Sequence, residues 1–210
     1  MANQTDVYQH FRKSEAPFVA QVLSWIDQAG TEYRPILTDF LDPRQAFILQ
    51  SLVGEKGDLK YHLAGGYLDA ERQRAIIAPD YFEPQEADFE LQLFEIRYPV
   101  KFAQLSHGKI LGTLVNAGIE RDVFGDIMNE ADRWQFFVTQ SMASYVENQI
   151  TKIGRVTVHI EPQRYTELIR PKDTWQFEST TVSSFRLDTI IATVYNLSRQ
   201  RAKELVQGNK

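Results

Sequence analysis

The chain of 210 residues contains no cysteine. Disulfides, thiolate catalysis and cysteine-based zinc sites are therefore excluded, which fits a reducing compartment. The four histidines, His10, His62, His107 and His159, are scattered and form no H-E-x-x-H pattern, so we expect no dedicated metal site. The sequence also lacks a phosphate-binding G-x-x-x-x-G-K-[ST] loop and a G-x-S-x-G nucleophile motif. We therefore predict a protein that is not an enzyme and that uses no small-molecule cofactor.

Long apolar runs are missing as well. No window approaches the roughly 18 uninterrupted apolar residues of a membrane span. Residues 1–10 lack the basic start and the apolar run of a secretory signal. We expect a soluble, cytoplasmic protein with no membrane partner. Hydrophobic residues make up 43% of the chain and aromatic residues 12%, which is enough for one large globular domain or a few small ones.

Charge is distributed unevenly along the chain. The formal net charge is −5, and residues 76–150 alone sum to about −7 by direct count. Residues 183–210 instead carry five cations against Asp188 and Glu204, about +3 in total. Because the local sign of the charge decides where a polyanion binds, the C-terminal segment is the favoured place for RNA. Any RNA-binding hypothesis must also account for the acidic middle segment.

Residues 1–78 are predicted to form a small α+β domain. Ser14 is a candidate N-cap for a first long helix. Asp42 followed by Pro43 is a second helix start signal, because an N-cap acceptor and a proline at the first helical position both favour a helix. The predicted elements are helices from Ser14 to Gly30 and from Pro43 to Gly54, and strands over residues 59–63 and 74–77.

Residues 79–163 are predicted to form a ferredoxin-like domain. The predicted elements are strands over residues 89–98, 123–128, 133–138 and 156–160, a helix capped by Ser106 that ends at Gly118, and a helix capped by Thr139 that ends at Gly154. The order β-α-β-β-α-β with helices on one face is that of RRM modules, whose open sheet face can stack bases. The same fold serves many functions, so the function must be argued from the site.

Three residues of this middle domain are candidate RNA contacts. On the last predicted strand, Arg155 and His159 would place a cation and a stackable imidazole on the open face, with plain surface positions as the alternative. Arg121 precedes Gly125 and Asp126, where the glycine permits a bulge or a close approach, and Asp126 either fixes a turn or pairs with Arg121. A structural role is the favoured reading of Arg121.

A further pattern allows a phosphate site near residue 65. Gly65 and Gly66 could form a backbone anion nest with the cations Arg72 and Arg74. Hairpin turn chemistry explains the same glycines equally well. Both hypotheses stay open at the level of sequence.

The C-terminal segment, residues 183–210, is predicted to form two helices after a linker over residues 164–182. Ser198 can cap the second helix, and Arg199 and Lys203 lie four apart on one face that could meet a phosphate backbone. A solvated helix face is the alternative. Arg186 and Arg201 are further candidate RNA contacts, and Asp188 either orients Arg186 or caps a helix. Apolar residues expected between the helices are Leu187, Ile190, Ile191, Leu197, Ala202, Leu205 and Val206.

The residues of this segment resemble a known RNA-binding module. R-L-D at 186–188, followed by L-S-R-x-x-A-x-E-L at 197–205, is similar to the first half of an S-four domain. In that family the helix pair is followed by a small β-sheet, whereas this chain stops at residues 208–210. The resemblance therefore implies the helix pair of an incomplete S-four domain.

Upstream motifs extend the resemblance along nearly the whole chain. They are Leu37 to Arg44, Gly65-Gly66-Tyr67 with Ala70-Glu71-Arg72, Leu111-Gly112-x-Leu114 leading to Gly118-Ile119-x-Arg121, and Gly125-Asp126-Ile127. In this order the motifs resemble the YlmH family. The resemblance implies a bacterial cytoplasmic RNA-binding protein that acts on the ribosome, in translation or in the rescue of stalled ribosomes. Its implied partners are ribosomal RNA and the large subunit, with tRNA as a further candidate.

Two other functions compete with this one. A link of the family to cell-division gene neighbourhoods implies a protein-interaction adaptor, for which the acidic middle domain would be the docking surface. S-four modules also occur on RNA-modifying enzymes, but the remaining sequence shows no matching catalytic signature.

Overall fold

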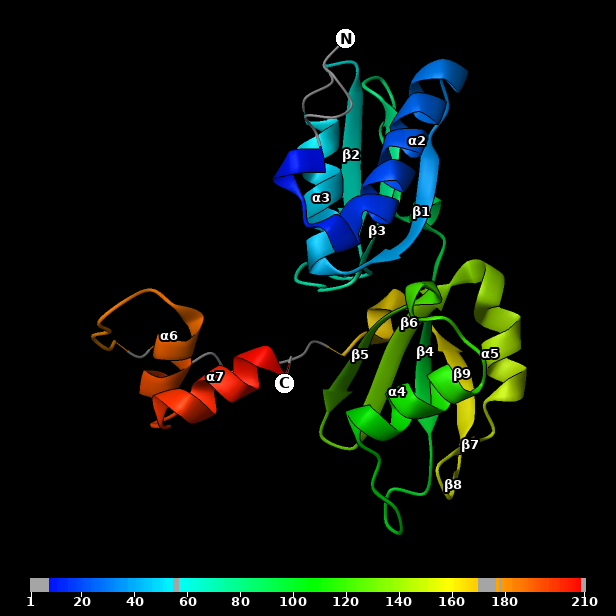
Figure 1. Cartoon of the computed structure of the whole chain (residues 1–210). Coiled ribbons are helices and arrows are strands. Elements are labelled where there is room, and N and C mark those ends of the chain that lie inside the picture. The colour runs from blue at the N-terminus through cyan, green and yellow to red at the C-terminus, as the bar shows by residue number, and fades with distance from the viewer. Residues whose placement is uncertain (1–7, 55–56, 170–176, 178, 209–210) are drawn as a thin grey trace. The chain divides into compact units, whose positions relative to one another are not determined.

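The structure of the chain is a computed structural model that describes residues 8–54, 57–169, 177 and 179–208. It divides into two units, Met1–Pro171 and Lys172–Lys210. The described part of the first unit contains two larger β-sheets with their helices and a small two-stranded sheet, and the second unit contains a pair of helices (Figure 1).

The N-terminal part of the first unit is a three-stranded antiparallel sheet in the order β1-β3-β2, covered on one face by two helices (Figure 1). Its elements are α2 (Ala16–Glu32), β1 (Ile36–Leu41), α3 (Pro43–Val53), β2 (Leu59–Ala64) and β3 (Gln73–Pro79), after the short 3₁₀ helices η1 (Tyr8–His10) and η2 (Lys13–Glu15). The central strand β3 is buried along its length, with Ala75 and Ile77 packed in the cluster beneath the helices and Ile76 and Ala78 in a cluster on the opposite side.

Local capping decides where these helices begin. At Asp42 the prediction is confirmed: the Asp42 carboxylate accepts a hydrogen bond from the Gln45 amide at 2.7 Å, and the Gln45 side chain accepts one from the Asp42 amide at 2.9 Å. At Ser14 it is wrong. Helix α2 begins at Ala16 after Glu15, and it continues past Gly30 to Glu32, where Tyr33 takes a left-handed conformation.

The second sheet has the ferredoxin-like strand order β5-β6-β4-β9, so the predicted topology is confirmed. Its elements are β4 (Leu91–Arg97), α4 (His107–Asn116), β5 (Phe124–Glu130), β6 (Arg133–Thr139), α5 (Ala143–Gln149) and β9 (His159–Gln163). Side chains of α4 and α5 pack on one face of this sheet, around the rings of Phe94 and Phe136.

The end of this module differs from the prediction. Helix α5 stops at Gln149 rather than at Gly154, and Thr139 is the last residue of β6. A separate two-stranded hairpin follows, β7 (Lys152–Ile153) with β8 (Val156–Thr157). The predicted strand over residues 156–160 is thus divided between β8 and β9.

In the second unit, α6 (Leu187–Val194) and α7 (Arg199–Gln207) pack against each other around Ala202, which is fully buried. A turn joins them at Asn196, which has a φ of 50°. Leu187 is exposed, so its predicted place between the helices is wrong. Among the described residues, no helix is long and apolar enough to cross a membrane.

Candidate RNA-binding surfaces

Two arginines of the helix pair are held by one nearly buried carboxylate. Asp188, in the first turn of α6, accepts a hydrogen bond from Arg186 Nε at 3.0 Å and lies 3.9 Å from Arg199 Nε of α7. The Asp188 side chain is 8% exposed, while those of Arg186 and Arg199 are 66% and 68% exposed. The hydrogen bond from Arg186 lowers the pKa of Asp188, so the carboxylate stays charged. The proposed orienting role of Asp188 is confirmed, and both guanidinium groups keep donors facing solvent.

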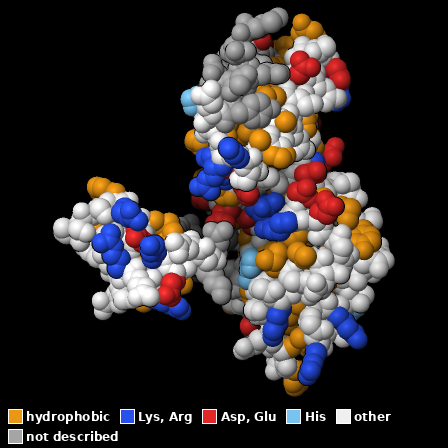
Figure 2. Space-filling view, viewed as in Figure 1, with side chains coloured by type: hydrophobic (Ala, Val, Ile, Leu, Met, Phe, Trp, Pro, Cys, Tyr) orange, Lys and Arg blue, Asp and Glu red, His pale blue; other side chains and the backbone are white. Residues whose placement is uncertain are grey.

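The rest of α7 adds charge and a cap. Ser198 Oγ accepts a hydrogen bond from the Arg201 amide at 3.2 Å, which confirms the predicted N-cap. Lys203 is exposed one turn after Arg199 on the same face. Arg201 instead pairs with Glu204 at 3.1 Å, so part of its charge is neutralised within the helix. Figure 2 shows Lys and Arg side chains gathered on the visible face of this unit.

The sheet face that should be open in an RRM-like module is covered here. Phe137 of β6 and Met128 of β5 point away from the helices and are buried against Phe40 and Ile76 of the N-terminal sheet. The phenylalanine rings of β6 are therefore part of the core. The hypothesis that bases stack on an open sheet face is wrong for this half of the sheet, because protein side chains fill the space.

The other half of that face is closed by the segment after β9. The side chain of Gln135 accepts a hydrogen bond from the Ile169 amide at 2.8 Å and donates one to the Glu167 carbonyl at 2.9 Å, which fixes the 3₁₀ helix η6 (Tyr165–Glu167) and its successor over the sheet. Gln135 also donates to Glu95, as does Arg133. Burial raises the pKa of Glu95, but the hydrogen bonds from Arg133 and Gln135 and the charges of Arg133 and Arg97 together lower it by more. The net shift of the pKa is therefore downward.

Arg155 and His159 do not share a strand face. His159 opens β9 opposite Arg97 of β4 and is exposed at the rim of the covered face. Arg155 lies in the turn of the β7–β8 hairpin, directly after Gly154 with a φ of 60°. The predicted common face is wrong because the hairpin interrupts the strand. Both side chains are nevertheless exposed at the same end of the sheet, since the hairpin leads into β9.

Arg121 lies in the 3₁₀ helix η4 (Arg121–Val123), directly before β5, and its side chain contacts the start of that strand. Its Nη1 donates to the carbonyls of Phe124 at 2.7 Å and Gly125 at 3.3 Å, and its guanidinium lies 4.3 Å from the centre of the Phe124 ring. Burial, together with the neighbouring charge of Arg72, lowers the pKa of Arg121 to about 10. These contacts give Arg121 the structural role that the sequence favoured.

Asp126 connects the two family motifs that lie far apart in the sequence. Its carboxylate accepts hydrogen bonds from the Tyr67 hydroxyl at 2.8 Å and from the amides of Glu71 at 2.8 Å and Arg72 at 3.1 Å. The turn at residues 65–72 and the start of β5 are therefore one joint. Asp126 was expected either to fix a turn or to pair with Arg121. It fixes a turn, and that turn, at residues 65–72, belongs to the N-terminal module.

The predicted anion nest is replaced by this joint. Arg72 donates to the carbonyls of Phe40 and Arg121, and Arg74 donates to those of Thr38 and Phe89. Burial lowers the pKa of both arginines, and both side chains donate hydrogen bonds to backbone carbonyl oxygens. The phosphate-site hypothesis is wrong, because the guanidinium groups face the protein interior.

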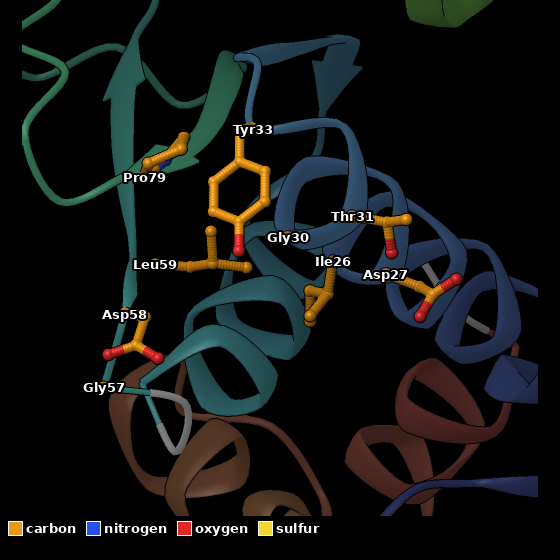
Figure 3. Close-up of a pocket in the computed structure, with 9 residues that line it drawn as sticks. All are labelled: Ile26, Asp27, Gly30, Thr31, Tyr33, Gly57, Asp58, Leu59 and Pro79. Carbon is orange, nitrogen blue, oxygen red and sulfur yellow. The ribbon is translucent and has the colours of Figure 1, made fainter.

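A cavity of about 330 Å³ lies in the N-terminal module, between the end of α2 and the start of β2. Figure 3 shows the Tyr33 ring over this cavity, with Asp27 and Asp58 on opposite sides of it. Its nine lining residues include no cation, histidine or cysteine, and two of them are aspartates, so its charge does not favour a phosphate. Within the described part of the chain, no group of three or more metal-ligating side chains comes together.

Both modules of the first unit match models of one family. Residues 14–82 match the model described as "YlmH, N-terminal", and residues 84–167 match "Putative RNA-binding domain in YlmH". Ribosome-associated protein quality control protein P2 of Bacillus subtilis (strain 168) is 41% identical over 203 residues, which are 97% of this chain and 79% of that protein. The solved structure of cell division protein ylmH from Streptococcus pneumoniae matches with a TM-score of 0.66 at 39% identity, and the match covers 78% of this chain and 99% of that one.

Fold, helix pair and matched models together define the class of protein: a modular α+β RNA-binding protein, built from a ferredoxin-like module, a smaller α+β module and a basic helix pair. Within that class the chain belongs to the YlmH family, as its motifs predicted.

Proposed function

We propose that this chain binds ribosomal RNA through its C-terminal helix pair and acts on the large ribosomal subunit, with bound tRNA as a second partner. The observation that carries the proposal is the pair of solvent-facing guanidinium groups held by Asp188. An arginine whose position is fixed in advance loses less entropy when it forms a bidentate pair with phosphate. The B. subtilis relative is named a ribosome-associated quality control protein, which supports the same function here.

The charge of the helix pair fits a polyanionic partner. Arg186, Arg199 and Lys203 are exposed in residues 183–210, a segment that contains only two acids, Asp188 and Glu204, each paired with an arginine. Each phosphate neutralised by such a cation releases a counterion, which favours binding at low salt. We propose that the role is non-enzymatic, because the cavity of the N-terminal module is lined by no histidine, cysteine or cation, and the Tyr67 hydroxyl and Asp126 carboxylate of the joint fix a turn.

Sedimentation of cell lysate through a sucrose gradient at low and high salt tests this function. We expect the chain to migrate with the large subunit at low salt and to leave it at high salt. Arg199→Ala with Lys203→Ala should abolish comigration. Lys13→Gln with Arg34→Gln removes the same charge from exposed positions of the N-terminal module, and this control should still comigrate with the large subunit. Finding the unmodified chain only at the top of the gradient would contradict the proposal.

A role as an adaptor in cell division is the second candidate. It is favoured by the name of the S. pneumoniae protein and by the acidic middle segment of this chain. Co-purification of a partner protein that survives nuclease treatment would support the adaptor, whereas loss of all partners after nuclease treatment would favour RNA.

A further inference from the structure

One end of the ferredoxin-like sheet carries an exposed loop and an exposed hairpin side by side. Arg97, the last residue of β4, pairs with His159, the first residue of β9. The loop over residues 98–106 leaves the sheet directly after Arg97, and the β7–β8 hairpin enters it directly before His159. Figure 1 shows the loop and the hairpin at the same end of the sheet, and α4 contacts β7 there.

This end is basic, although the segment around it is acidic. Residues 98–119 and 148–160 contain no aspartate or glutamate. They contribute the exposed cations Lys101, Lys109, Lys152 and Arg155. The acids near this end of the sheet are Glu95 and Glu161, which both pair with Arg97, and those of the β5–β6 turn, whose Asp132 carbonyl accepts a hydrogen bond from the Tyr98 hydroxyl. Figure 2 shows Lys and Arg side chains with apolar ones at this end.

An exposed aromatic ring lies on the same loop, next to Lys101 in the sequence. Phe102 is 89% exposed on the loop, and Val100 beside it is 45% exposed. The loop is a closed turn, because the amides of Phe102 and Ala103 both donate to the Pro99 carbonyl, at 2.9 and 3.1 Å. The turn presents the Phe102 ring outward rather than packing it. Exposed apolar side chains that gather in one patch beside polar residues mark interaction sites, and Val100 and Phe102 lie together on this loop beside Lys101.

We propose that this basic pole, formed by Lys101, Phe102, Lys109, Lys152 and Arg155, binds a single-stranded segment of RNA. A base stacks on Phe102 and the neighbouring phosphates meet the cations. The ligand is unpaired RNA because a ring on a turn needs a free base face, which a duplex does not offer. The proposal rests on the proposed function and adds a second contact, on the end of the module rather than on its covered sheet face.

The pole is tested by fluorescence anisotropy with a labelled single-stranded RNA of about twelve nucleotides and the matching duplex. The full chain carries Arg199→Ala and Lys203→Ala, so that the helix pair contributes little. Phe102→Ala should weaken single-strand binding about tenfold and leave duplex binding nearly unchanged, and Phe102→Tyr should restore it. Leu68→Ala, at an equally exposed apolar position, is the control and should have no effect.

The cations are tested in the same way. Lys152→Gln with Arg155→Gln should lower affinity and reduce the slope of log K against log salt by about 0.7 for each lost phosphate contact. Lys13→Gln with Arg34→Gln, which changes the net charge equally, should leave that slope unchanged. Pole variants that bind RNA as the controls do, or a background chain without single-strand binding, would overturn the proposal.

Binding of a protein instead of RNA at the pole would also overturn the proposal. Such a partner would still co-purify with the unmodified chain after nuclease treatment, but not with the pole variants. The proposed function fails separately. If pole variants bind normally while the unmodified chain still comigrates with ribosomes and the Arg199→Ala, Lys203→Ala variant does not, only the pole is refuted.

Discussion

Gly66 is a position where the joint between the two sheets tolerates little change. Its φ is +92°, and a Cβ built on it would lie 2.2 Å from Cζ of Phe137. Phe137 is fully buried in β6 and stacks on Tyr165 with ring centres 5.7 Å apart, so the ring has little room to withdraw. We therefore expect Gly66→Ala to destabilise the first unit through both backbone strain and overpacking.

The magnitude follows from these two causes. An alanine at this φ costs about 1–3 kcal/mol in strain, and overpacking of a filled core costs about 1–3 kcal/mol. The lower entropy of alanine in the unfolded chain offsets roughly 0.4–1 kcal/mol. The net loss in the free energy of unfolding is about 1–6 kcal/mol, against the roughly 5–15 kcal/mol of a typical domain.

Urea unfolding followed by tryptophan fluorescence measures this loss. Gly57→Ala is the matched control, since a Cβ there meets nothing within 4 Å, and it should stay within about 0.5 kcal/mol of the unmodified chain. Combining Gly66→Ala with Phe137→Leu should cost less than the sum of the two changes, because the smaller side chain relieves the clash. Equal unfolding midpoints for Gly66→Ala and Gly57→Ala would refute the reasoning.

Three further predictions concern the sheet face and the helix pair. Glu95→Gln should cost about 1–3 kcal/mol at pH 7. Because the pKa of Glu95 in the folded protein lies below its ordinary value, its contribution to stability is present above that ordinary value and is lost as pH falls through the folded value. Urea titrations at pH 7 and pH 3 should therefore show the difference shrinking in acid. Ser198→Ala should cost about 1 kcal/mol through loss of the α7 cap, seen as faster amide exchange in α7, whereas equal exchange rates would argue against the cap. Arg199→Ala with Lys203→Ala should reduce the salt slope of RNA binding by about 0.7–0.9 per phosphate, and an unchanged slope would exclude these side chains from the interface.

Elements fixed by neighbours in sequence could be predicted. The caps at Asp42 and Ser198 need only a hydrogen bond three residues away, so the residue types were sufficient. The β-α-β-β-α-β order followed from apolar periodicity. Strand β1 was missed, because buried Thr38 interrupts its apolar pattern; its hydroxyl accepts a hydrogen bond from the Ala75 amide of β3.

Contacts between distant segments could not be predicted. The covering of the sheet by residues 165–169 depends on one glutamine, Gln135, whose partners lie more than 30 residues away. The Asp126 joint likewise links positions 54 to 59 residues apart. Nothing in the local pattern of either segment indicates its partner, so the face was expected to be open, and a phosphate site at Arg72 and Arg74 stayed one of two open hypotheses.

Mapping of RNA contacts by ultraviolet crosslinking in cells, followed by mass spectrometry of the crosslinked peptides, tests the central claim most directly. Our account predicts crosslinks in peptides that contain Arg186, Arg199 or Lys203, with ribosomal RNA from the large subunit attached. Crosslinks confined to the N-terminal sheet, or no RNA crosslinks from a chain that still co-purifies with a protein partner, would contradict it.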